Sequence, residues 1–175
     1  MGEKEVALAF ARRLSAELQS RGIATRLLRE SNIALTLEQR AVLANEAVPS
    51  LYLAVHAAAS GSGVHLFTSD IAAVSPPPAF LPWGSAQAAY VNTSQAIAEV
   101  LAVELLKRDI PTLNLRAPVA PLNAIAAPAV AIELSAPAGG TAAELNSVAY
   151  QQGLCGAIAA AVAANRGRLP YGETQ

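Results

Sequence analysis

The sequence is poor in several residue types that mark particular classes of protein. Only one of its 175 residues is a cysteine, so no disulfide bond can form within the chain. Charged residues make up 14% and the formal net charge is -1, which argues against a basic surface for nucleic acid or anionic lipid. No run of about 18 uninterrupted apolar residues is present, so we expect no membrane span. The charged start, residues 1–5, does not have the pattern of a signal peptide.

The chain is rich in apolar residues, many of which are alanine. Hydrophobic residues account for 53% of the sequence, which is enough to bury a sizeable core and too much for a disordered chain. The length fits a single domain. We therefore assign residues 1–165 to one domain and residues 166–175 to a polar C-terminal tail.

Helical and extended patterns alternate along the chain. Apolar residues recur every four positions from Val6 to Leu18, and Thr36-Leu-Glu-Gln39 has the form of a capping box at a helix start. The patterns predict helices near 3–21, 36–47, 85–107 and 142–164, and strands near 23–29, 51–55, 64–68, 112–115 and 129–132. This alternation predicts an α/β fold with three layers, α/β/α, around a mostly parallel central sheet.

Two polar residues directly follow the most apolar of these strands. His56 comes after residues 51–55 and Glu133 after residues 129–132; both segments lack polar alternation, which is typical of strands buried on both faces. Ligands of open α/β sheets bind outside the carboxyl ends of the strands, so we expect both side chains to face one crevice. A neutral polar group buried there without a partner would cost about 1–3 kcal/mol, which a metal ion or water would relieve.

Glu3 is the third candidate, because it lies three residues before Val6 on the apolar stripe of the first helix. Glutamate and histidine are suitable zinc ligands, and a second glutamate can act as general base for a metal-activated water. Structural roles are the alternatives. Glu3 would then favour the helix dipole, His56 would be a hydrogen-bonded core histidine, and Glu133 would pair with Arg40.

Six short segments, spread from residue 3 to about residue 164, carry further information through their order. They are Glu3-Lys-Glu-Val-x-Leu8, Leu35-Thr-Leu-Glu-x-Arg40 with Ala44-Asn45, Leu53-Ala-Val-His-Ala57, the helix pattern from Ser94 to Leu105, Pro128-Ala-Val-Ala-Ile-Glu-Leu134, and Ala149-Tyr-Gln151. In the same order, these segments resemble those of one enzyme family, the zinc-dependent N-acetylmuramoyl-L-alanine amidases of type 3. Each motif is weak alone, and their shared order makes the resemblance specific.

This resemblance implies a zinc hydrolase of bacterial peptidoglycan that works in the cell envelope. Such enzymes cut the amide between the lactyl group of N-acetylmuramic acid and L-alanine of the stem peptide. The resemblance implies that Glu3 and His56 are zinc ligands and that Glu133 is the catalytic general base. Peptidoglycan would be the binding partner and Zn²⁺ the cofactor.

The sequence also departs from the family pattern. The family opens with a strand that ends in Gly-His-Gly-Gly and supplies a further zinc ligand, whereas only Met1 and Gly2 precede Glu3 here. The one remaining histidine, His65, is not expected to reach the crevice. Residues 134–137 also differ from the family's Gly-Phe-x-Ser-Asn segment. The alternative is therefore a divergent or truncated amidase-like domain that binds peptidoglycan or a protein partner without catalysis.

Overall fold

The computed structural model describes residues 2–31, 33–141 and 143–169. The helices are α1 (Glu3–Gln19), α2 (Leu37–Glu46), α3 (Val91–Leu106) and α4 (Val148–Asn165), with short 3-10 helices η1 (Trp83–Ala89), η2 (Leu122–Ala124), η3 (Glu144–Asn146) and η4 (Arg166–Arg168). The strands are β1 (Tyr52–Ala57), β2 (Val64–Thr68), β3 (Thr112–Arg116) and β4 (Ala129–Leu134). The predicted tail, 166–175, begins with η4, and its residues 170–175 lie outside the described part of the chain.

Local sequence explains where the first two helices begin and which faces they bury. Helix α1 buries an apolar stripe that includes Val6, Phe10 and Leu14, as the four-residue spacing predicts. Helix α2 starts at the predicted capping box: the Gln39 backbone amide donates to Thr36 Oγ1 at 3.1 Å, and the Thr36 amide donates to Gln39 Oε1 at 2.9 Å. These bonds satisfy backbone donors that a helix start otherwise leaves unpaired.

The four strands form one sheet in the order β1-β4-β2-β3. Strands β1 and β4 are parallel, β2 and β3 are parallel, and β4 and β2 are antiparallel. Strand β4 is central and almost wholly buried, as predicted for residues 129–132. The prediction that residues 51–55 are buried on both faces is wrong, because β1 lies at an edge and Leu53 and Val55 are only half-buried.

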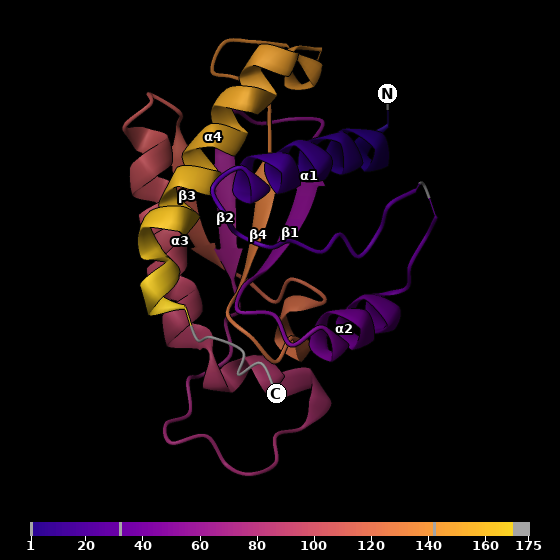
Figure 1. Cartoon of the computed structure of the whole chain (residues 1–175), viewed down its shortest axis with the longest axis vertical. Coiled ribbons are helices and arrows are strands. Elements are labelled where there is room, and N and C mark those ends of the chain that lie inside the picture. Colours follow the sequence, from indigo (N-terminus) through magenta and orange to yellow (C-terminus); the bar gives the residue numbers. More distant parts are fainter. Residues whose placement is uncertain (1, 32, 142, 170–175) are drawn as a thin grey trace.

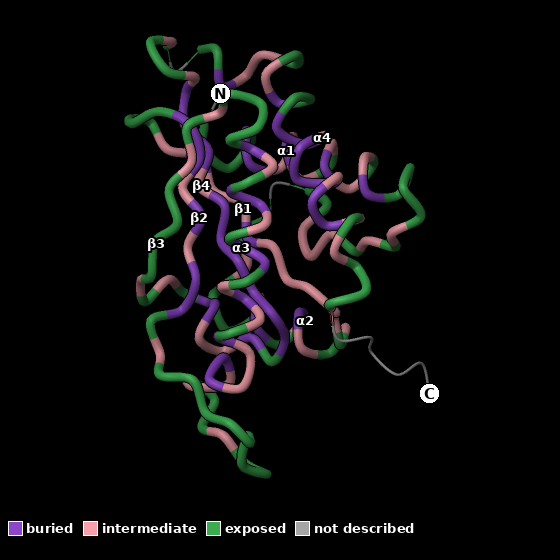
Figure 2. Tube along the Cα trace, turned by 90° about the vertical axis from the view of Figure 1, so that its left-hand side faces the viewer, coloured by how far each residue is buried: buried purple, intermediate pink, exposed green. Residues whose placement is uncertain are grey.

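Helices pack on the two faces of the sheet, which gives the predicted three layers. Figure 1 shows α1 and α4 lying across one face. Helices α1, α3 and α4 share one apolar cluster with strand residues such as Val130 and Ile132. Helix α2 and η2 share a second cluster with Ala129 and Ala131 on the opposite face. Figure 2 shows burial concentrated in β4 and β2, whereas β3 is largely exposed. No helix among the described residues is long and apolar enough to cross a bilayer.

The predicted strand at residues 23–29 is wrong, because this segment pairs with no strand in the described structure. Side chains hold it to α1 instead: Thr25 Oγ1 lies 2.6 Å from Ser15 Oγ, and Gln19 Nε2 donates to Thr25 Oγ1 at 3.0 Å. A groove of about 790 Å³ separates this segment from the free edge of β1. His56 and Glu3 both line this groove.

Candidate active site

Three polar side chains form a row across the sheet. In the register of the strands His56 of β1 is opposite Glu133 of β4, and Glu133 is also opposite His65 of β2. Residues directly opposite each other on neighbouring strands project from the same face. His56, Glu133 and His65 therefore share the face that α2 covers farther along the sheet. Both predicted residues lie within their strands, one residue before each strand ends.

The polar side chains form two pairs, His65 with Glu133 and His56 with Glu3. His65 Nδ1 lies 3.1 Å from Glu133 Oε1, and these side chains are 24% and 35% exposed. His56 Nδ1 lies 3.8 Å from Glu3 Oε1. The Glu3 side chain lies on the side of α1 that faces β1, as predicted, but it is 61% exposed and is not buried in the core. As the first residue of α1 it instead reaches beyond the packed part of the helix toward His56.

The His65 ring is fixed by its surroundings on β2 and in the loop before it. It meets Phe67 edge-on, with ring centroids 6.3 Å apart and an interplanar angle of 81°. Gly61 lies beside the ring, because a Cβ added at this glycine would come 3.9 Å from His65 Cε1. Nδ1 of this imidazole lies toward Glu133.

Residues 134–137, where the sequence departs from the family pattern, are hydrogen-bonded to the loop between β1 and β2 and to helix α4. The Ser135 amide donates to the Gly63 carbonyl at 2.9 Å, and Ser135 Oγ donates to the Ser60 carbonyl at 3.2 Å. Tyr150 Oη donates to the Ser135 carbonyl at 3.1 Å from helix α4. These bonds fasten the loop between β1 and β2 against the end of β4, next to Glu133.

Other residues of the motifs have structural contacts away from this row. Asn45 joins α2 to the segment after η2: its Nδ2 donates to the Ala124 carbonyl at 2.9 Å and its Oδ1 accepts from the Ala126 amide at 2.8 Å. Among the described residues, Glu133 pairs with His65 and not with Arg40. Burial raises the pKa of Tyr52, and the positive charge of Arg40 partly opposes this rise.

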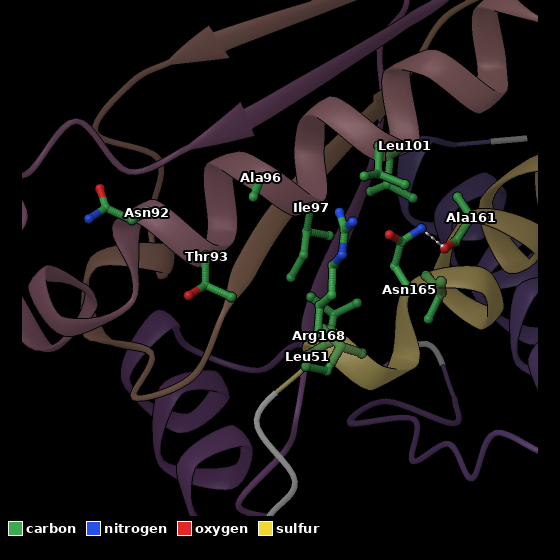
Figure 3. A pocket seen from close by; sticks show the side chains of 12 residues that line it. Leu51, Asn92, Thr93, Ala96, Ile97, Leu101, Ala161, Asn165 and Arg168 are labelled. Carbon is green, nitrogen blue, oxygen red and sulfur yellow. Dashed lines mark hydrogen bonds between the residues drawn. The ribbon is translucent and has the colours of Figure 1, made fainter.

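A separate apolar cavity of about 320 Å³ lies between α3 and α4 (Figure 3). Ile97 and Leu101 line it from α3, and Asn165 lines it from α4, where its Nδ2 donates to the Ala161 carbonyl at 3.0 Å. Leu51, directly before β1, also lines it, whereas His56 lies near the other end of that strand. The cavity is therefore not part of the polar row.

Only part of a zinc site is assembled by these residues. Carboxylate and imidazole are both zinc donors, and two donor atoms at roughly 2 Å from one tetrahedral ion lie about 3.3 Å apart. The 3.8 Å between Glu3 Oε1 and His56 Nδ1 is wider than this, so the two side chains face each other without having the spacing of a tetrahedral ligand pair. Across residues 2–31, 33–141 and 143–169, no group of three or more His, Cys, Asp or Glu side chains is placed to hold a metal ion.

Comparison with known proteins identifies the family. A family model described as N-acetylmuramoyl-L-alanine amidase matches residues 1–164. The chain belongs to this amidase family. No curated protein sequence matches the chain. The family assignment confirms the resemblance that the six motifs indicate.

Solved amidase structures share the fold of this family member. The catalytic domain of CwlV from Bacillus (Paenibacillus) polymyxa var. colistinus is 20% identical with a TM-score of 0.70, covering 94% of this chain and 85% of that one. AmiC2 of Nostoc punctiforme is 20% identical with a TM-score of 0.69, covering 95% and 85%. Ami1 of Mycobacterium smegmatis is 25% identical with a TM-score of 0.74, covering 96% and 78%.

Sequence reasoning missed the contribution of His65. The alternation of β2 correctly places His65 on the face of Phe67, away from Val64 and Leu66. The position of β2 next to β4, and its antiparallel register with Glu133, could not be read from that alternation. A pairing between residues 65 and 133 is the information that would have placed this histidine at the site.

Proposed function

We propose that this amidase family member hydrolyses peptidoglycan, cutting the amide between N-acetylmuramic acid and L-alanine of the stem peptide. Membership of the family supports the reaction class. The observation that carries the proposal for this chain is the row in which Glu3 faces His56 and Glu133 lies opposite His56 on the next strand. Because peptidoglycan is the substrate, we also propose that the protein acts in the cell envelope.

Glu3 and His56 are the residues that would hold Zn²⁺ in this proposal. What supports it is that the two donor groups face each other, with their donor atoms 3.8 Å apart, although these two residues supply fewer ligands than the three protein ligands of a usual catalytic zinc site. When bound, zinc would polarise the scissile carbonyl and lower the pKa of a water molecule. The pair itself joins the first turn of α1 to the end of β1.

Glu133 is the proton carrier of the proposed reaction. Its carboxylate would accept a proton from the attacking water as the hydroxyl oxygen bonds to the scissile carbonyl carbon. When the carbon–nitrogen bond breaks, Glu133 would return the proton to the nitrogen of the leaving L-alanine. The side chain is 35% exposed, so both water and substrate can reach it.

The proposed function predicts different effects for the three residues. Glu133→Gln keeps the shape of the side chain and removes the base, so we expect at least about a 100-fold loss of muropeptide cleavage with zinc content unchanged. Glu3→Ala or His56→Ala should lower zinc content and activity together. Zinc is measured by elemental analysis of the purified protein and cleavage by chromatography of released stem peptides. Full activity of Glu133→Gln would reject the proposed role.

The second candidate is a domain that binds peptidoglycan, or a protein partner, without cutting. It is favoured by one observation, that no group of three metal-ligating side chains is assembled among the described residues. This candidate predicts that purified protein sediments with isolated cell-wall sacculi and releases no stem peptide, with or without added zinc. Release of L-alanine-linked peptides by the unmodified chain would reject it.

A further inference from the structure

We propose that His65 is a positioning residue that holds the carboxylate of Glu133 for proton transfer. This inference rests on the proposed function of Glu133 as general base. It starts from the 3.1 Å contact between His65 Nδ1 and Glu133 Oε1 across the antiparallel pair β2–β4. The two residues are direct register partners, so the backbone of the sheet fixes their separation.

The contact leaves one oxygen of Glu133 available for chemistry. Oε1 is bonded to His65, whereas no described residue donates a hydrogen bond to Oε2. A carboxylate held through one oxygen cannot swing freely, and its second oxygen then has a defined direction for accepting a proton. Such orientation of a base by a third group is a general feature of acid–base sites.

Contacts on the His65 ring make it suitable for this role. Phe67 contacts the ring edge-on and Gly61 lies beside it, while Nδ1 faces the carboxylate. Nδ1 must carry the proton in order to donate to Glu133. The pair is partly exposed to solvent, and such pairs contribute little to folding stability. The contact is therefore better explained by orientation of Glu133 than by stabilisation of the fold.

The tautomer of His65 is the first test, and it needs no activity. Long-range proton–nitrogen NMR spectra of the full chain should show His65 protonated at Nδ1 at a pH where the ring is neutral. In Glu133→Ala the proton should move to Nε2, because the acceptor at Nδ1 is gone. The His65 signals are assigned by their loss in His65→Asn. An Nε2 proton in the unmodified protein would overturn the proposal.

Matched substitutions at His65 test whether the contact positions Glu133. Asparagine can place an amide donor near the position of Nδ1, whereas leucine cannot donate. In a crystal structure of His65→Leu we expect the Glu133 side chain to adopt more than one rotamer, and in His65→Asn a single one. A single, unchanged Glu133 rotamer in His65→Leu would overturn the positioning role.

Kinetics separate this inference from the proposed function. For muropeptide cleavage, His65→Leu should lower kcat about tenfold with little change in KM, and His65→Asn should recover most of this loss, since correct orientation supplies part of general-base catalysis. An unchanged kcat in His65→Leu would overturn the inference while leaving the amidase function intact. If the unmodified chain shows no cleavage, the proposed function fails, and the tautomer and rotamer measurements still decide whether His65 holds Glu133.

Discussion

At the scale of single residues, the sequence predicts which residues belong to the candidate site better than it predicts which side chains they contact. His56 and Glu133 lie on neighbouring strands, which is the arrangement expected for residues near the carboxyl ends of two strands. Their nearest partners were not predictable, because Glu133 contacts His65 and His56 faces Glu3. Such contacts depend on strand order and on where a helix projects, and neither is encoded in a short window of sequence.

The thiol of Cys155 gives a prediction at this scale. Burial raises its pKa from 9.0 to about 12; nearby Arg13 opposes the rise and Glu17 adds to it. Cys155 is fully buried and its thiol donates to the Phe10 carbonyl at 3.8 Å. We expect no reaction of the native protein with a thiol reagent at pH 8, and full reaction in guanidinium chloride. Rapid labelling of native protein would contradict this environment for the thiol.

The raised pKa of Cys155 also makes the free energy of unfolding depend on pH. Between pH 9.0 and about 12 the folded protein keeps a proton that the unfolded chain loses. The folded state then binds more protons, so the free energy of unfolding falls as the pH rises through this range. Well below pH 9.0 the thiol is protonated in both states, so it adds no pH dependence to the free energy of unfolding.

At the scale of elements, long periodic segments were predicted well and the segment 23–29 was not. Helices α1 and α2 follow from an apolar stripe and a capping box, both of which are local features. A strand exists only if a neighbour supplies ladder hydrogen bonds, and the residues after Gly22 have no such neighbour among the described residues. A local apolar pattern cannot show whether such a partner exists.

The free edge of β1 gives a prediction at this scale. The Tyr52 amide bonds to the Pro128 carbonyl at 2.8 Å, and even-numbered residues of β1 continue this ladder toward β4. The Leu53 and Val55 amides point the opposite way, into the groove beside the segment 23–29. In hydrogen-exchange NMR we expect these two amides to exchange at least about tenfold faster than that of Ala54, because only Ala54 is in a ladder. Equally slow exchange at Val55 would show that the edge is covered.

At the scale of the whole molecule, the fold class was predictable because it depends on the alternation of elements rather than on their exact pairing. Four helices and four strands lie close to their predicted positions and give the three layers. The antiparallel register between β4 and β2 was not predicted, and it is this register that brings His65 into the site. The site thus depends on topology more strongly than the fold class does.

If Glu3 and His56 bind zinc, the ion should stabilise the folded protein. Glu3 belongs to α1 and His56 to β1, so an ion shared by them would join the first helix to the edge of the sheet. An ion that binds only the folded state stabilises it by about 2.7 kcal/mol at 100 times its Kd, so the thermal midpoint should rise steadily with zinc concentration.

His56→Ala should abolish this rise, whereas His65→Asn should keep it, because His65 pairs with Glu133. Since few protein ligands imply a weak site, the rise should require a larger excess of zinc than a three-ligand site needs. A midpoint that does not respond to zinc, in protein that still unfolds cooperatively, would show that Glu3 and His56 share no ion in this chain.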